Sequence, residues 1–90
     1  MNLSAKVQIP PQVMARQLGD ETVILNLESG IYFGLDSVGA NIWKLFEKGC
    51  TLSDVINEMM EMYDVEPKQI KKDLESLVDN LQASGLLEIS

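Results

Sequence analysis

Residues 30–45 read GIYFGLDSVGANIWKL, and this stretch predicts a short strand that turns directly into an amphipathic helix. Residues 31–35 are apolar at nearly every position, which favours an extended strand with apolar side chains on both faces. Either Asp36 or Ser37 can cap the helix that follows, because both side chains accept hydrogen bonds from a first helical turn. The helix then ends at Gly49, which can adopt the left-handed conformation that commonly closes a helix.

The residues before this stretch predict further strands. Residues 22–27 alternate between two faces, and three apolar side chains share one of them: Val23, Leu25 and Leu27. A short segment that ends in Gly30 separates this run from residues 31–35, which is typical of a hairpin. Residues 13–18 form another short run. If the runs pair in sequence order, residues 31–35 form one edge of a three-stranded antiparallel sheet.

Two more helices are predicted in the second half of the chain. Thr51 can cap the first of them, and Asp54 lies in its first turn, where a negative charge is favourable. Pro67 lies near the start of the last helix, which Gly85 ends. Strands followed by three helices predict an α+β fold that resembles a winged helix-turn-helix domain, with a three-stranded antiparallel sheet before the helices.

Length and composition limit what the chain can do. It has 90 residues, 46% of them hydrophobic, and a formal net charge of −7. That length fits one domain covering residues 1–90, because a second domain would be too small to hold its own core. The chain has no histidine and one cysteine, Cys50, which excludes Ser/His and Cys/His catalysis, histidine metal sites and disulfide frameworks. We therefore expect no catalytic residue, no metal and no cofactor.

Hydropathy and charge also limit the partners. No apolar run approaches the ~20 residues that a membrane span needs, and the start of the chain lacks a signal-peptide pattern. We therefore expect a soluble cytoplasmic protein with no membrane partner. Acidic residues are concentrated in residues 47–66. Such a surface repels phosphate backbones, so we also expect no nucleic acid partner.

One basic cluster interrupts this acidity, and it consists of Lys68, Lys71 and Lys72 at the start of the last helix. In a helix-turn-helix protein that end of the helix meets the DNA bases, so a winged-helix DNA-binding regulator is one alternative. The cluster would also attract a negatively charged peptide. A solvated helix face explains it without any ligand.

A second alternative concerns Ser37. The sequence around it looks like the serine loop of acyl or peptidyl carrier proteins, in which phosphopantetheine is attached to a serine at a helix N-terminus. Carrier proteins, however, are all-helical bundles, and the residues before Ser37 are strand-like and β-branched. A helix cap is the simpler interpretation.

The apolar strand at residues 31–35 raises a further question. An uncovered apolar edge promotes aggregation unless something pairs with it. An extended peptide that adds itself as a further strand is a recognised use of such an edge. Alternatively, Tyr32 packs against a neighbouring helix or against the second chain of a homodimer, and composition does not separate these two interpretations.

Residues 30–45 resemble the signature of the coenzyme PQQ synthesis protein D family, in which a Gly-x-Tyr strand leads through a Leu-Asn turn to a Gly-Ala-x-Ile-Trp helix. Residues 22–27, 51–63 and 81–87 also match the family in order and spacing. Asp36 stands where the family usually has Asn. Because both residues cap helices, this departure leaves the expected fold unchanged.

The resemblance implies a peptide-binding module, the recognition element of ribosomally made and post-translationally modified peptides. Such modules hold the leader segment of the precursor peptide and deliver it to a modifying enzyme, which is a radical SAM maturase or, in lasso-peptide systems, a leader peptidase. In the family the leader adds a strand to the sheet and lies against the third helix. We therefore expect these peptide-binding residues: Ile31, Tyr32, Phe33, Gly34, Leu35, Lys71, Leu74, Glu75 and Val78. The helix residues are chosen because Val78 widens the apolar stripe of the third helix toward that side.

Overall fold

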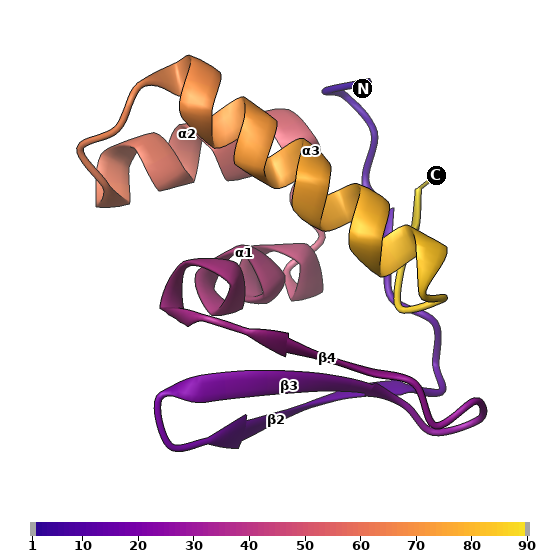
Figure 1. Ribbon diagram of the computed structural model, residues 1–90. Helices are drawn as coiled ribbons and strands as arrows, with labels where there is room; N and C mark the ends of the chain where they lie inside the picture. Colours follow the sequence, from indigo (N-terminus) through magenta and orange to yellow (C-terminus); the bar gives the residue numbers. More distant parts are fainter. Residues whose placement is uncertain (1, 90) are drawn as a thin grey trace.

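A three-stranded antiparallel sheet lies beneath three helices in the computed structural model, which describes residues 2–89 (Figure 1). The sheet strands are β2 (Val13–Leu18), β3 (Glu21–Asn26) and β4 (Tyr32–Leu35). The helices are α1 (Ser37–Glu47), α2 (Leu52–Met62) and α3 (Pro67–Ala83). The α+β fold with the sheet before the helices is confirmed. None of the helices described is long and apolar enough to cross a membrane.

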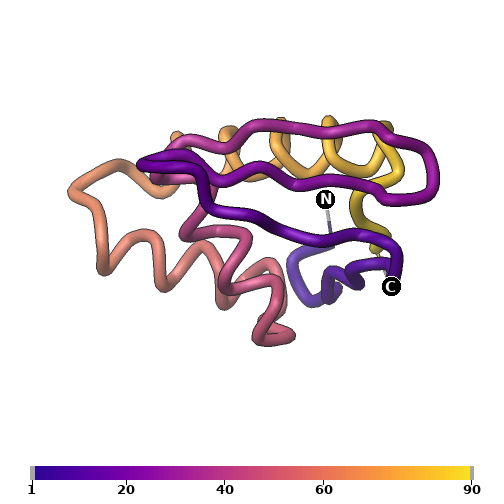
Figure 2. The backbone as a smooth tube through the Cα atoms, turned by 90° about the horizontal axis from the view of Figure 1, so that it is seen from below, coloured from indigo at the N-terminus to yellow at the C-terminus, as the bar shows by residue number. Residues whose placement is uncertain are grey.

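The order of strands in the sheet is β2-β3-β4, so β4 is an edge strand as predicted. Gly30, with a φ of 77°, lies in the turn that joins β3 to β4. Seen from below, β4 follows the line of α3 while β2 lies at the opposite edge of the sheet (Figure 2). The free edge of β4 is therefore on the side of the molecule where α3 runs.

The two faces of the sheet differ in what covers them. Ile24 is fully buried against the helices, and its cross-strand neighbours Ala15 and Phe33 lie on the same side of the sheet. Successive side chains alternate between the faces, so Val23 and Leu25 point to the other side. That outer face also carries exposed apolar side chains: Met14, Leu18 and Tyr32. The predicted alternation is confirmed. The apolar residues Val23 and Leu25 face outward, however, and Ile24 is the residue that packs against the helices.

Local hydrogen bonds fix the starts of the first two helices. Asp36 caps α1, because its Oδ1 accepts a hydrogen bond from the N–H of Gly39 at 2.8 Å. Thr51 and Asp54 form a reciprocal capping box at the start of α2, with distances of 3.1 and 3.2 Å. Of the two predicted caps for α1, the structure uses Asp36 and leaves Ser37 as the first helical residue.

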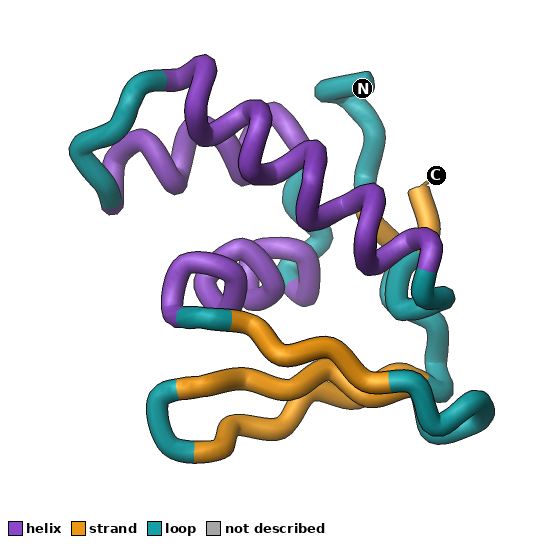
Figure 3. Tube along the Cα trace, in the orientation of Figure 1, coloured by secondary structure: helices purple, strands orange, loops and turns teal. Residues whose placement is uncertain are grey.

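The N-terminal segment completes the fold by packing against the start of α2 and the C-terminal segment. The N–H groups of Leu52 and Ser53, which have no partner inside the helix, donate to carbonyl oxygens of Ala5 and Leu3 at 3.0 and 2.8 Å. A second, two-stranded sheet joins β1 (Val7–Gln8) to β5 (Glu88–Ile89). The two ends of the chain therefore lie close together, as Figure 3 shows.

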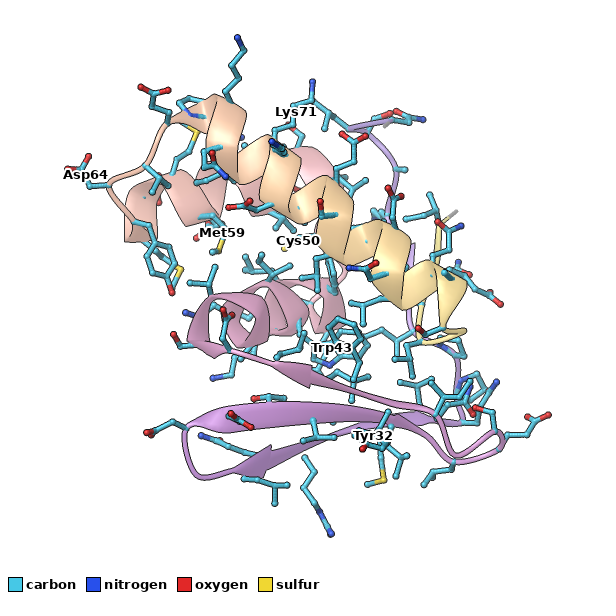
Figure 4. The ribbon with its side chains drawn as sticks, viewed as in Figure 1. Tyr32, Trp43, Cys50, Met59, Asp64 and Lys71 are labelled. Atoms are coloured by element: carbon cyan, nitrogen blue, oxygen red, sulfur yellow. The ribbon has the colours of Figure 1, made fainter. Side chains whose placement is uncertain are left out.

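The core lies between the helices and the inner face of the sheet. Trp43 points into this space (Figure 4) and is 2% exposed, with its ring edge-on to Phe46 at a centroid distance of 6.3 Å. Trp43 therefore belongs to the hydrophobic core. Met59 is buried as well, whereas Met62 is half exposed.

Candidate functional site

The backbone of β4 has hydrogen-bonding groups on its free edge. The N–H of Asn26 donates to the carbonyl of Ile31 at 2.9 Å, so the main-chain groups of Ile31 point toward β3. Along an antiparallel strand these groups point to alternate sides. Phe33 therefore pairs with β3, whereas the N–H and C=O groups of Tyr32 and Gly34 point away from the sheet. Two residues of β4 can thus pair with a further strand.

A groove runs beside this edge, between β4, the start of α1 and one flank of α3. Its volume is about 600 Å³. The apolar residues that line it are Phe33, Leu35, Val38, Ile42 and Leu77. Two glycines, Gly34 and Gly39, and three acidic residues, Glu21, Asp36 and Asp73, complete the lining. This groove is named the β4–α3 groove below.

Gly39 sets how closely α1 approaches β4. A Cβ atom at this position would lie 3.2 Å from Cδ2 and 3.3 Å from Cβ of Leu35. Both contacts are tighter than ordinary packing, so a side chain at position 39 would require a small shift between α1 and Leu35. A glycine destabilises a helix because its backbone is flexible. At position 39 it allows α1 to pack closely against Leu35 of β4, and both residues line the groove.

The predicted strand residues lie where a peptide strand could reach them. Phe33, Gly34 and Leu35 line the β4–α3 groove. Tyr32 is 72% exposed and its side chain points to the outer face of the sheet. Ile31 precedes β4 by one residue and is also exposed. Peptide contact by these residues stays a prediction.

The predicted helix residues lie elsewhere. Leu74 and Val78 are buried in the core, at 0% and 4% exposed. Lys71 lies on top of α3, away from the sheet (Figure 4), and it lines a different hollow together with Glu75. The flank of α3 that faces β4 instead carries Asp73 and Leu77. Peptide contact by the four predicted residues also stays a prediction, but the β4–α3 groove is formed by others.

The sequence held only a weak signal for the residues that it missed. Leu77 belongs to the apolar stripe of α3 but is only half buried, because it lies where the stripe meets the groove. Val38 and Ile42 both lie on α1 and line the groove, where Val38 is 38% exposed. Such residues at the margin of a stripe are candidates for ligand contact, but periodicity does not say which margin is left open.

The alternative sites can be compared with the same structure. Ser37 is exposed, but a β-sheet occupies the region before it, so the fold is not the helical bundle of a carrier protein. Cys50 is half-buried, next to the capping box of α2. Within residues 2–89 no group of His, Cys, Asp or Glu side chains is arranged to hold a metal ion.

An antiparallel sheet with a free edge strand, a groove beside that edge and a helix along the groove define a small α+β domain of the winged-helix type. The chain belongs to the coenzyme PQQ synthesis protein D (PqqD) family, whose sequence profile matches residues 21–87. No curated protein matches its sequence significantly.

Two solved structures share the whole fold. One is TbiB1 in complex with the TbiA(beta) leader peptide, which is 34% identical, with a TM-score of 0.84 over 90% of this chain and 94% of the other. The second is lasso peptide synthetase B1 complexed with the leader peptide, at 25% identity and a TM-score of 0.83. That similarity covers 92% of this chain and 98% of the other. Both similar proteins were thus solved with a leader peptide bound.

Proposed function

We propose that this chain is a non-catalytic module that binds the leader segment of a ribosomally made precursor peptide and delivers it to a modifying enzyme. The observation that carries the proposal is the free edge of β4, where the main-chain groups of Tyr32 and Gly34 point outward beside the β4–α3 groove. The leader would add to this edge as a fourth strand. The similarity to two leader-peptide complexes supports the same function.

Strand addition divides recognition into two parts. Main-chain hydrogen bonds to Tyr32 and Gly34 would supply affinity that depends little on the sequence of the peptide. Alternate side chains of the added strand would point into the groove, where Phe33 and Leu77 offer apolar contacts. The remaining side chains would stand on the outer face, next to Tyr32. Specificity would therefore come from the residues that enter the groove.

The enzyme that receives the peptide would be a radical SAM maturase or a leader peptidase. The chain itself contains no histidine, and no Ser, Thr, Cys or Lys side chain is found among the described residues that line the β4–α3 groove. A module of this kind would act in the cytoplasm, where ribosomes make the precursor. Modification or cleavage of the peptide would then require the second protein.

The test is a titration of the isotopically labelled chain with a synthetic leader peptide from the precursor encoded beside this gene, followed by NMR. We expect shift changes in β4, at the start of α1 and on the Asp73–Leu77 flank of α3. Changes confined to Lys71 and Glu75 would instead place the peptide on the opposite flank. An absence of binding to any neighbouring precursor would contradict the proposed function.

A pair of variants at Gly34 tests the strand addition itself. Gly34→Pro removes an N–H that points to the free edge, and leaves the pairing of β4 with β3 intact. We expect it to weaken peptide binding roughly tenfold, because one main-chain hydrogen bond is lost and the ring obstructs the edge. Gly34→Ala keeps the N–H, and its Cβ would have no atom within 4 Å. Equal affinity of the two variants would rule out pairing at this residue.

A further inference from the structure

The charged residues that line the β4–α3 groove are all acidic. Its lining combines an apolar surface with three acidic residues, Glu21, Asp36 and Asp73, and no basic residue is found among the described residues that line it. Asp36 comes from the start of α1 and Asp73 from α3, so the acidic groups face the groove from different elements. A peptide in this groove therefore meets a negative potential as well as apolar side chains.

The lysines of α3 lie on the flank that is turned away from the groove. Lys68, Lys71 and Lys72 line a hollow there, together with the acidic residues Glu75 and Asp79. Of the described residues that line the groove, α3 contributes Leu77 and the charged Asp73. The lysine cluster would therefore attract carboxylates to the flank of α3 that does not line the β4–α3 groove. The sequence-based prediction that the bound peptide presents carboxylates to Lys71 and Lys72 concerns this other flank of α3.

Both aspartates retain capacity for a cationic partner. Oδ1 of Asp36 accepts one hydrogen bond, from the N–H of Gly39, and Oδ1 of Asp73 accepts one, from Nε2 of Gln69 at 2.9 Å. An ionised carboxylate offers about four acceptor positions on two oxygens. Each group can therefore receive a further charge-assisted hydrogen bond without losing the one that it has.

We propose, on the basis of the function proposed above, that the peptide bound beside β4 carries a lysine or arginine that enters the groove. Its head group is held by Asp73, in the negative potential to which Asp36 and Glu21 contribute. Its aliphatic stem lies on the apolar lining, where Leu77 and Val38 are exposed enough to be covered. Long basic side chains suit such a site because they bury the stem and keep the charge near solvent.

The geometry disfavours the other side chains that could enter. An acidic residue would face three groups of its own charge, and an unpaired polar residue would leave the apolar lining partly uncovered. A purely aliphatic residue would cover the lining but leave the carboxylates without a partner from the peptide. The amphipathic character of lysine and arginine matches both parts of the lining.

The test is a selection of random peptides, displayed as a library and captured by the full chain. We expect the enriched peptides to align as extended segments with lysine or arginine preferred at one position. Asp73→Lys should change the preference at that position to aspartate or glutamate. Asp79→Lys is the matched control, because Asp79 is an exposed acid on the opposite flank of the same helix. It should leave the basic preference in place.

A direct measurement uses one enriched peptide and its variant with glutamine in place of the basic residue. We expect that change to weaken binding roughly threefold to tenfold, and added salt to reduce the difference. Enriched peptides without a basic position would overturn this inference and leave the proposed function intact. A loss of the basic preference in Asp79→Lys as well as in Asp73→Lys would also overturn it. A library with no enriched peptide would contradict both proposals.

Discussion

The side-chain amide of Asn26 joins the end of β3 to the turn that follows α3, because its Nδ2 donates to the carbonyl oxygen of Gly85 at 3.2 Å. Its Oδ1 accepts from the N–H groups of Glu28 and Ser29 at 2.9 and 3.1 Å and so shapes the turn before β4. Asn26 is buried, at 6% exposed. One side chain therefore fixes the turn that positions β4 and connects that turn to the residues that follow α3.

Replacing Asn26 should destabilise the fold. Asn26→Ala leaves two turn N–H groups and one carbonyl without their partner, and we expect it to lower the free energy of unfolding by ~1–3 kcal/mol. Urea unfolding followed by Trp43 fluorescence measures the change, because Trp43 is buried and is the one tryptophan of the chain. Asn57→Ala, on the exposed side of α2, is the control and should change stability by less than ~0.5 kcal/mol. Equal effects would show that the Asn26 bonds contribute nothing.

Truncation should cost more at Ile24, inside β3, than at Leu27, which directly follows that strand. Ile24 is fully buried, so Ile24→Ala should cost ~2–5 kcal/mol in the free energy of unfolding. Leu27 is 60% exposed, and Leu27→Ala should cost less than ~1 kcal/mol because little burial is lost. Thermal or urea unfolding of both variants tests this. A larger loss from Leu27→Ala would mean that the sheet presents its other face to the helices.

Those faces show where sequence reasoning is strong and where it stops. The alternation of residues 22–27 was visible, because strand side chains repeat with a period of two. The sequence did not show which face points to the core. Val23, Leu25 and Leu27 form the more apolar face, whereas Ile24 shares its face with polar residues. Which face of the strand is buried depends on where the helices lie, and in this fold they cover the face of Ile24 and leave the more apolar face outside.

Helix α3 shows the same limit. Its boundaries follow from Pro67 and Gly85, both of which were predicted, and its apolar stripe is confirmed. The stripe is wide enough for either margin to border a groove. Packing buries Val78 and leaves Leu77 half-buried, so the orientation of α3 relative to α1 and β4 decides which margin borders the groove. The local sequence does not specify that orientation.

The capping box at the start of α2 should behave as a coupled pair. Thr51→Ala and Asp54→Ala each remove one of two reciprocal hydrogen bonds, and each should cost about 1 kcal/mol in the free energy of unfolding. The double variant should cost less than the sum, because either loss disturbs the geometry of the other bond. Chemical denaturation of the set gives the coupling energy. Strictly additive losses would indicate two independent caps.

Leu77 should contribute to peptide binding more than to stability. It is half-buried in the groove, so Leu77→Ala should weaken binding of a leader peptide roughly threefold to tenfold through lost apolar contact. Leu18→Ala is the matched control, because Leu18 is 58% exposed on β2, at the far edge of the sheet. Isothermal titration calorimetry of both variants measures the effect. A similar loss in both would place the peptide outside the groove.

The outer face of the sheet would change when a peptide binds. Met14, Leu25 and Tyr32 share this face, which none of the helices within residues 2–89 covers. A fourth strand beside β4 would place half of its side chains on the same plane as Tyr32. The loaded domain would then present a broader surface, made partly of domain and partly of peptide, than the empty one. A receiving enzyme that contacts this plane would distinguish cargo-bearing copies from empty ones, without any movement in the domain itself.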